Sequence, residues 1–154
     1  EIQRKNTTKA LDYFNQAANL FTDNTKKANV YYRIATMYSK SNKVQSRAYA
    51  RKAIQVKPSY GKAYLLIASL YGSSINECGS TQFEKRAVYW LAAQYCDKAA
   101  AADSTLKGKA SGDAARYRAA APSKTEIFQE NKAGQRIAFN CWIGESVVVP
   151  NIGK

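Results

Sequence analysis

The 154-residue sequence contains no histidine, and it has only one methionine, three cysteines and three prolines. Without histidine, the chain has no Ser-His-Asp or Cys-His catalytic arrangement and no histidine-ligated metal site. The cysteines form no Cys-x-x-Cys pair, and there is no Gly-x-x-x-x-Gly-Lys phosphate loop. We therefore expect no catalytic residues, no metal and no cofactor, and we predict that the protein is not an enzyme.

Long apolar runs are also missing. No stretch approaches the roughly 18 apolar residues that a membrane-spanning helix requires, so we expect no transmembrane segment. Hydrophobic residues make up 45% of the chain and aromatic residues 12%, which is enough to bury one continuous core. Because the first residue is Glu rather than Met, we interpret the chain as a processed or excised piece of a longer protein.

Acidic residues are scarce, with 11 Asp and Glu against 24 Lys and Arg, which gives a formal net charge of +13. Residues 24–76 contain ten basic residues and no acidic one. Such a charge attracts anionic partners, including acidic proteins, nucleic acid and anionic glycolipid surfaces, but it is equally compatible with a solvated face. Lys43, Arg47 and Arg51 recur every four residues, which predicts one basic stripe along a helix.

Two copies of one helical pattern follow each other in the middle of the chain. Four residues of the first copy have counterparts 33 residues later: Tyr31, Ile34, Ala35 and Tyr38 correspond to Tyr64, Ile67, Ala68 and Tyr71. The spacing places an aromatic, an aliphatic, a small and a second aromatic residue on one helix face. A period of this length is typical of helical solenoids, and the alternative is a helical bundle with a chance echo.

Apolar periodicity and helix-stop signals predict the other elements. We expect helices at 4–20, 26–39, 43–57, 61–70, 82–102 and 105–121, with a long loop rich in Gly and Ser at 72–81. Ser123 and Glu126 form a capping box, which predicts a helical turn through Phe128. The period then falls to two, which predicts a β-hairpin with strands at 135–143 and 146–149 around a two-residue turn at Gly144 and Glu145.

The repeated pattern resembles the tetratricopeptide repeat, or TPR. Ala53 and Pro58 match the end of the second helix in that repeat, whereas Ser46 and Ala50 replace its first Ala and its Phe. The resemblance implies a mostly α fold, in which residues 1–121 form a right-handed, TPR-like solenoid of antiparallel helix hairpins with a capping helix. Residues 122–154 would form a C-terminal turn and a small β-hairpin packed on the last helices, since a lone hairpin is only marginally stable.

The C-terminal part carries a second resemblance. The segments FEKRAVYWLA (83–92), PSKTEIF (122–128) and GQRIAFNCWIGESVVV (134–149) are similar to the C-terminal end of envelope-associated TPR proteins of the Bacteroidota. This resemblance implies a periplasmic or cell-envelope location, with the cytoplasm as the alternative. It also implies a function in binding other proteins through the repeats, within a larger assembly.

The TPR resemblance also implies a concave groove lined by the first helices of the repeats. The corresponding positions are Asn29, Tyr32, Arg33, Thr36, Lys40, Lys62, Leu65, Leu66 and Ser69. Their tyrosine and leucine floor with cationic edges favours an extended or helical peptide of acidic character. TPR proteins that clamp a partner's carboxylate have Lys and Asn where this chain has Tyr32 and Thr36, so that specific activity is not expected.

Two functions remain open at this stage. The leading hypothesis is a non-enzymatic scaffold that binds a peptide or partner protein in the groove. The alternative is binding of an anionic polymer, such as nucleic acid or lipopolysaccharide, through the basic stripe Lys43, Arg47 and Arg51 on the convex side.

The cysteines and the first helix give two further expectations. Cys96 lies near the apolar face of its helix and is expected to be a buried free thiol, whereas Cys78 and Cys141 are predicted to form a disulfide, with free thiols as the alternative. The helix at 4–20 matches the second helix of a repeat that lacks its first helix. Apolar residues left uncovered there would favour self-association or docking to upstream sequence, and they are Tyr13, Phe14 and Phe21.

Overall fold

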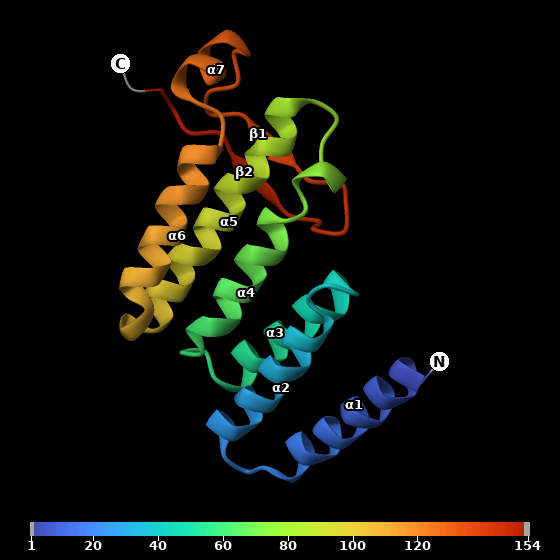
Figure 1. The fold of residues 1–154 in the computed structure, drawn as a ribbon. Helices are drawn as coiled ribbons and strands as arrows, with labels where there is room; N and C mark the ends of the chain where they lie inside the picture. The colour runs from blue at the N-terminus through green and yellow to red at the C-terminus, as the bar shows by residue number, and fades with distance from the viewer. Residues whose placement is uncertain (1, 153–154) are drawn as a thin grey trace.

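The computed structural model describes residues 2–152, and this range is mostly helical with one small antiparallel sheet (Figure 1). The α-helices are α1 (Ile2–Leu20), α2 (Asn24–Tyr38), α3 (Lys43–Val56), α4 (Gly61–Gly72), α5 (Gln82–Ala102), α6 (Lys107–Ala120) and α7 (Lys124–Gln129). Two 3₁₀ helices, η1 (Ile75–Glu77) and η2 (Ser104–Leu106), and the strands β1 (Arg136–Ala138) and β2 (Ser146–Val148) complete the described range. None of the helices in it combines the length and hydrophobicity of a membrane span.

Side-chain caps fix where four of the helices begin. Asp23 before α2 and Asn42 before α3 each accept a hydrogen bond from a backbone N–H of the first turn. Thr81 begins a capping box at α5, and Ser123 and Glu126 form the predicted capping box at α7. These oxygens pair N–H groups that the first turn of a helix leaves without a partner.

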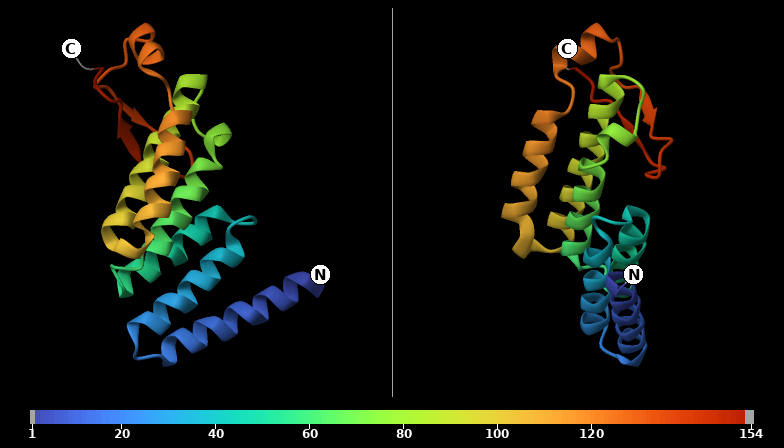
Figure 2. Two further views of the ribbon diagram at one scale, coloured as in Figure 1. Left: turned by 60° about the vertical axis from the view of Figure 1, so that its left-hand side comes forward. Right: turned by 45° about the vertical axis from the view of Figure 1, so that its right-hand side comes forward.

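Helices α1 to α6 pack in sequence order, each against its neighbours in the chain. Figures 1 and 2 show the result as an elongated array, with α1 at one end and α7 and the hairpin at the other. Small residues line the helix contacts, since alanines such as Ala35, Ala50 and Ala68 are fully or almost fully buried. Side chains of this size allow neighbouring helices to approach closely, which accounts for the alanine-rich sequence.

The C-terminal hairpin lies against α5, with Ile137 paired opposite Val147. Its strands are shorter than expected, and the predicted two-residue turn at Gly144 and Glu145 is wrong. Instead, the Phe139 N–H donates to the Glu145 carbonyl (2.8 Å) and the Gly144 N–H donates to the Phe139 carbonyl (3.2 Å), which closes a longer loop. This loop leaves the strand path because it is bonded to the helices, as described below.

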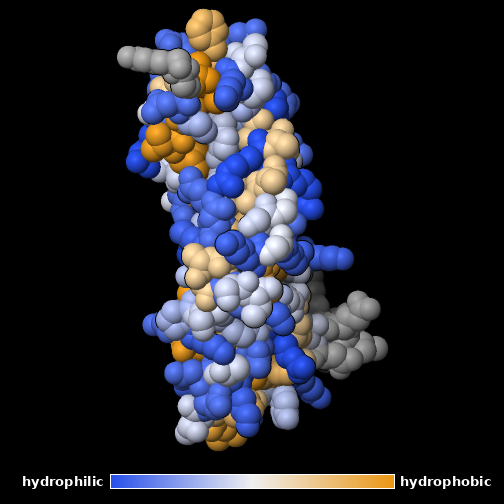
Figure 3. All heavy atoms as spheres, turned by 90° about the vertical axis from the view of Figure 1, so that its left-hand side faces the viewer, coloured by the Kyte–Doolittle hydropathy of each residue, from blue (hydrophilic) through white to orange (hydrophobic). Residues whose placement is uncertain are grey.

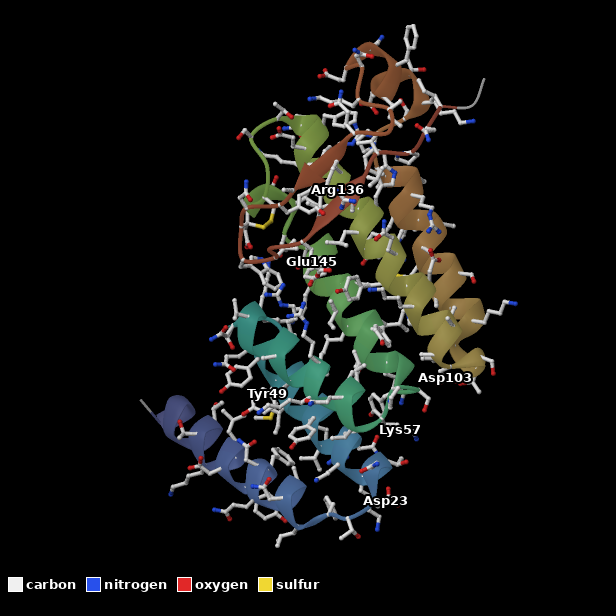
Figure 4. All side chains as sticks on the ribbon, turned by 180° about the vertical axis from the view of Figure 1, so that it is seen from behind. Asp23, Tyr49, Lys57, Asp103, Arg136 and Glu145 are labelled. Carbon is white, nitrogen blue, oxygen red and sulfur yellow. A yellow bond between two sulfur atoms is a disulfide. The ribbon has the colours of Figure 1, made fainter. Side chains whose placement is uncertain are left out.

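A disulfide joins Cys78, which follows η1, to Cys141 in the hairpin loop. The two Cα atoms are 5.3 Å apart and the residues are 63 positions apart in the sequence. Figure 4 shows the bond where the loop between α4 and α5 meets the hairpin. Cys96 is a buried free thiol, and burial raises its pKa to about 11, so it stays protonated at neutral pH.

Arg86 on α5 fixes the connection between α6 and α7. Its guanidinium donates to the carbonyls of Ala120 and Ala121, both at 3.1 Å, and to the carboxylate of Glu126 at 2.5 Å. Glu126 also accepts the backbone N–H of Ser123 at 2.7 Å. The Arg86 hydrogen bond, followed by that of Ser123, lowers the pKa of the Glu126 carboxyl from 4.5 to about 2.

Exposed apolar side chains are scattered over the surface. Leu20 and Tyr13 on α1 are 82% and 69% exposed, and Phe128 on α7 is 75% exposed. Phe14 and Phe21 are half-buried, so the uncovered face predicted for α1 is carried by Tyr13 and Leu20. On the face shown in Figure 3, hydrophilic side chains dominate and hydrophobic ones form small separate patches.

We predict that thiol titration of the denatured, non-reduced chain finds one free thiol, that of Cys96. Replacing both bonded cysteines, as in Cys78→Ser with Cys141→Ser, should lower the free energy of unfolding by roughly 2–4 kcal/mol, because a long loop in the unfolded chain is no longer closed. Three free thiols would contradict the disulfide.

A second prediction concerns pH. Because the folded pKa of Glu126 lies below its ordinary value, its stabilising effect is present above pH 4.5 and is lost as the pH falls toward about 2. Urea unfolding should therefore find Glu126→Gln less stable than the wild type at neutral pH, with the difference vanishing under acid. Glu130→Gln is the matched control, and a pH-independent difference for Glu126→Gln would exclude the carboxylate as the cause.

Candidate binding groove

An open groove crosses α2, α4 and α6. It consists of two adjoining depressions that share Tyr32 and Lys62. The first, which we call the α6 compartment, has a volume of about 460 Å³ and is lined mainly by Leu65, Leu66, Leu106, Asp113 and Tyr117. The second, the α1 compartment, has a volume of about 500 Å³ and is lined by Phe21, Lys26, Asn29, Val30, Arg33 and Tyr60. Depressions of this size suit peptide side chains or small ligands.

Most of the groove residues expected from the sequence line these two compartments. They are Asn29, Tyr32, Arg33, Lys62, Leu65, Leu66 and Ser69. The other two line neither compartment: the Thr36 hydroxyl donates to the Arg33 carbonyl at 2.7 Å, and Lys40 lies in the turn after α2. The groove is therefore shorter along α2 than the sequence indicates.

Helix α6 supplies a wall that the sequence analysis did not find. Lys109, Asp113, Arg116 and Tyr117 all line the α6 compartment. Their spacing of four, three and one is the helical signal that could have identified a single face. From the sequence, this helix is predicted only as a cap, because Gly108 and Gly112 interrupt it.

The groove is markedly cationic. Among the described residues that line it, Lys26, Arg33, Lys62, Lys109 and Arg116 carry positive charge, and Asp113 carries the one carboxylate. Lys109 and Arg116 are each paired with Asp113, at 3.3 and 3.2 Å. Among the side chains of residues 7–152, the exposed side chains of Arg33 and Lys62 find no hydrogen-bond or ion-pair partner, so both are available to a ligand.

Tyrosines form the floor between these charges. The rings of Tyr32 and Tyr60 lie 5.6 Å apart, and the Tyr60 hydroxyl donates to the Asn29 side chain at 2.7 Å. Burial raises the pKa of Tyr32, so its phenol stays protonated and can donate a hydrogen bond. Within the described residues this hydroxyl has no hydrogen-bond partner, so Tyr32, which lines both compartments as Lys62 does, offers an unused donor.

The basic stripe predicted on α3 has a different environment. The Arg47 guanidinium donates to the carbonyls of Ile143 at 2.7 Å and Trp142 at 2.9 Å, and to the Tyr71 hydroxyl at 3.1 Å. It also lies 4.8 Å from the centre of the Trp142 ring. Lys43 donates to the Ser74 hydroxyl at 2.9 Å and pairs with Glu77 at 3.1 Å. Arg47 and Lys43 thus bind the chain's own loops.

Glu145 completes these contacts from the hairpin side. It accepts hydrogen bonds from the hydroxyls of Tyr71 and Tyr95, the latter at 2.9 Å, and it lies 3.7 Å from Arg51. Figure 4 shows Glu145 where the hairpin loop meets the helices. We call Arg47, Glu145, Tyr71 and Tyr95 the hairpin clasp, because they join the hairpin loop to α3, α4 and α5.

Lys43, Arg47 and Arg51 of the predicted stripe therefore all have acidic or carbonyl partners within the chain. Reversing these charges would disrupt the hairpin as well as any anion contact, because Arg47 and Glu145 form part of one network. Such a variant cannot separate a convex site from a groove site.

Comparisons with protein-family models, with curated proteins and with solved structures found no significant match. The groove and the clasp are therefore interpreted from their geometry and chemistry alone.

We predict that Arg47→Met lowers the free energy of unfolding by about 2–4 kcal/mol, because it leaves the carbonyls of Trp142 and Ile143 and the Tyr71 hydroxyl without their cationic donor. Lys40→Met changes an exposed lysine in the turn after α2 and serves as the control. Its free energy of unfolding should stay within about 0.5 kcal/mol of the wild-type value. Chemical denaturation measures both. Equal, small effects of the two changes would show that Arg47 does not hold the hairpin.

Proposed function

We propose that this protein is a non-enzymatic interaction module that binds a peptide segment of a partner protein in the groove across α2, α4 and α6. The observation that carries the proposal is an apolar floor bordered by Arg33 and Lys62, two cations that no group within residues 2–152 neutralises by an ion pair. An open groove with apolar contacts and unused polar groups is the arrangement that peptide recognition requires.

We further propose that the helices form a TPR-like solenoid. Two features support this assignment. The Ile-Ala pairs of both sequence copies, Ile34–Ala35 and Ile67–Ala68, are buried at equivalent places on α2 and α4. Successive helices also pack on their neighbours in chain order, as repeat proteins do.

A location in the cell envelope or periplasm is part of the proposal. It is supported by the Cys78–Cys141 disulfide, because structural disulfides persist mainly in oxidising compartments. A reducing cytoplasm would leave both cysteines as thiols and would remove this support.

Binding of nucleic acid or lipopolysaccharide through the α3 stripe is less well supported. Arg47 and Lys43 are held by the hairpin loop and by Glu77, so they are poorly placed to contact a row of phosphates. Arg33 and Lys62, by contrast, have no ion-pair partner in the described part of the chain and adjoin an apolar floor.

The test is a selection of short random peptides, displayed on phage, against the immobilised chain. Selected peptides are synthesised and their affinities compared for the wild type, for Leu66→Ala in the groove, and for Phe128→Ala as an exposed apolar control outside it. We predict that Leu66→Ala weakens binding about tenfold, the effect of losing one apolar anchor, and that Phe128→Ala leaves it unchanged.

A labelled single-stranded DNA oligonucleotide and purified lipopolysaccharide serve as probes of the competing function. Multiple phosphate contacts weaken by orders of magnitude between about 50 and 200 mM salt, whereas contacts with an apolar floor weaken little. Tight, steeply salt-dependent binding of either probe, together with peptides that ignore Leu66→Ala, would replace the groove proposal with the anionic-polymer one.

A further inference from the structure

The division of the groove into two compartments indicates what its ligand must look like. Each compartment has its own apolar lining, with Leu65, Leu66 and Leu106 on one side and Phe21 and Val30 on the other. A ligand with one continuous apolar surface would fit poorly across both compartments, because the two residues that the compartments share have polar groups at the ends of their side chains. These are Tyr32, with a free hydroxyl, and Lys62, with a free ammonium group.

The position of Lys62 at this boundary is notable, because the same side chain also lines a third, more polar depression at the start of α4. Hydrogen bonds from Thr105 lower the pKa of the Asp103 carboxyl there, and the charges of Lys57 and Lys62 add to this effect. Lys62 is exposed, and no acidic group within residues 2–152 lies within ion-pair distance of it. A carboxylate of a ligand could therefore form a direct ion pair with this ammonium group.

The charges on both sides of Lys62 also favour an acidic ligand. Arg33 borders the α1 compartment without an ion-pair partner in the described part of the chain. In the α6 compartment, Asp113 is shared between Lys109 and Arg116, so the pair of cations is only partly neutralised. An acidic ligand is attracted along the whole groove, while a basic one is repelled.

Building on the proposed function, we propose that the groove recognises a bipartite acidic peptide. Two apolar side chains, one in each compartment, flank at least one Asp or Glu whose carboxylate pairs with Lys62 and accepts the Tyr32 hydroxyl. The apolar anchors supply most of the affinity, and the central carboxylate fixes the register of the peptide in the groove.

The test uses one peptide from the selection described above and three of its variants: the central acid changed to its amide, and each apolar anchor changed in turn to Ser. The amide variant should bind the wild type about two- to fivefold more weakly, as expected for one exposed ion pair. The same change should have no effect on binding to Lys62→Gln, and Lys62→Arg should restore the preference for the acid. Lys40→Gln, a cation that the structure places outside both compartments, is the matched control and should behave as the wild type.

The anchor variants test the two compartments separately. A peptide without the anchor for the α6 compartment should bind the wild type and Leu66→Ala equally well. A peptide without the anchor for the α1 compartment should bind the wild type and Val30→Ala equally well. Each loss alone should weaken binding about tenfold.

Two negative results are distinguishable. If the peptides respond to Leu66→Ala but bind equally well with a single anchor or with an amide in place of the acid, the bipartite ligand is refuted and the groove remains the binding site. If they respond to neither Leu66→Ala nor Val30→Ala, the proposed function itself is refuted.

Discussion

The hydrogen bonds between Arg47 and the hairpin loop are the interaction on which the rest of this structure depends. One guanidinium satisfies the carbonyls of Trp142 and Ile143, which lie outside the strand pairing and are partly buried. The same loop carries Glu145, which accepts the hydroxyls of Tyr71 and Tyr95. A short hairpin that is unstable alone is thereby joined to three helices at once.

The disulfide and the clasp both hold this loop. The bond at Cys141 joins the loop to the segment after η1, and Trp142 donates its indole N–H to the buried Ser74 in the turn after α4, at 3.3 Å. Burial raises the pKa of Tyr71 and Tyr95, and the bond to Glu145 adds to this effect, so both phenols remain hydrogen-bond donors at neutral pH. The hairpin loop is thus joined to the helices through polar groups of Trp142, Ile143 and Glu145.

These contacts within the chain determine which basic residues remain available to a binding partner. The segment of residues 24–76 has ten basic residues and no acid, and its acidic partners come from elsewhere in the chain: Glu77 for Lys43 and Glu145 for Arg51. Arg33 and Lys62 receive no such partner within the described residues. These two unpaired cations therefore adjoin the apolar floor of the groove.

Local signals in the sequence were sufficient for most of the helical framework. The helix expected at 82–102 has those limits in the structure, and the capping box at Ser123 and Glu126 is formed as predicted. The strand expected at 135–143 is wrong beyond Ala138, because a period of two continues in the sequence where the backbone turns toward Arg47. That contact joins residues 95 positions apart, and no local pattern can report it.

The same limit applies to the groove. Its floor on α2 and α4 could be predicted from the sequence, because Tyr32, Leu65 and Leu66 occupy equivalent faces of a repeated pattern. The wall on α6 could not, since its position depends on how a helix without the pattern packs against α5. The contacts that the α3 stripe makes within the chain could not be predicted either. Arg47 has the spacing of a solvent-exposed residue, and its partners lie in a loop far away in the sequence.

The central claim is that partners bind in the groove while the stripe and the hairpin have only structural roles. Nuclear magnetic resonance tests it most directly, by following the backbone amide signals of the isotope-labelled chain as a groove-selected peptide is added. The account predicts that shifts concentrate on the groove-lining parts of α2, α4 and α6, around Tyr32, Leu66 and Tyr117, and that the signals of the hairpin loop and of α3 near Arg47 stay in place. Shifts centred on Arg47 and the hairpin loop, with the groove unaffected, would contradict it.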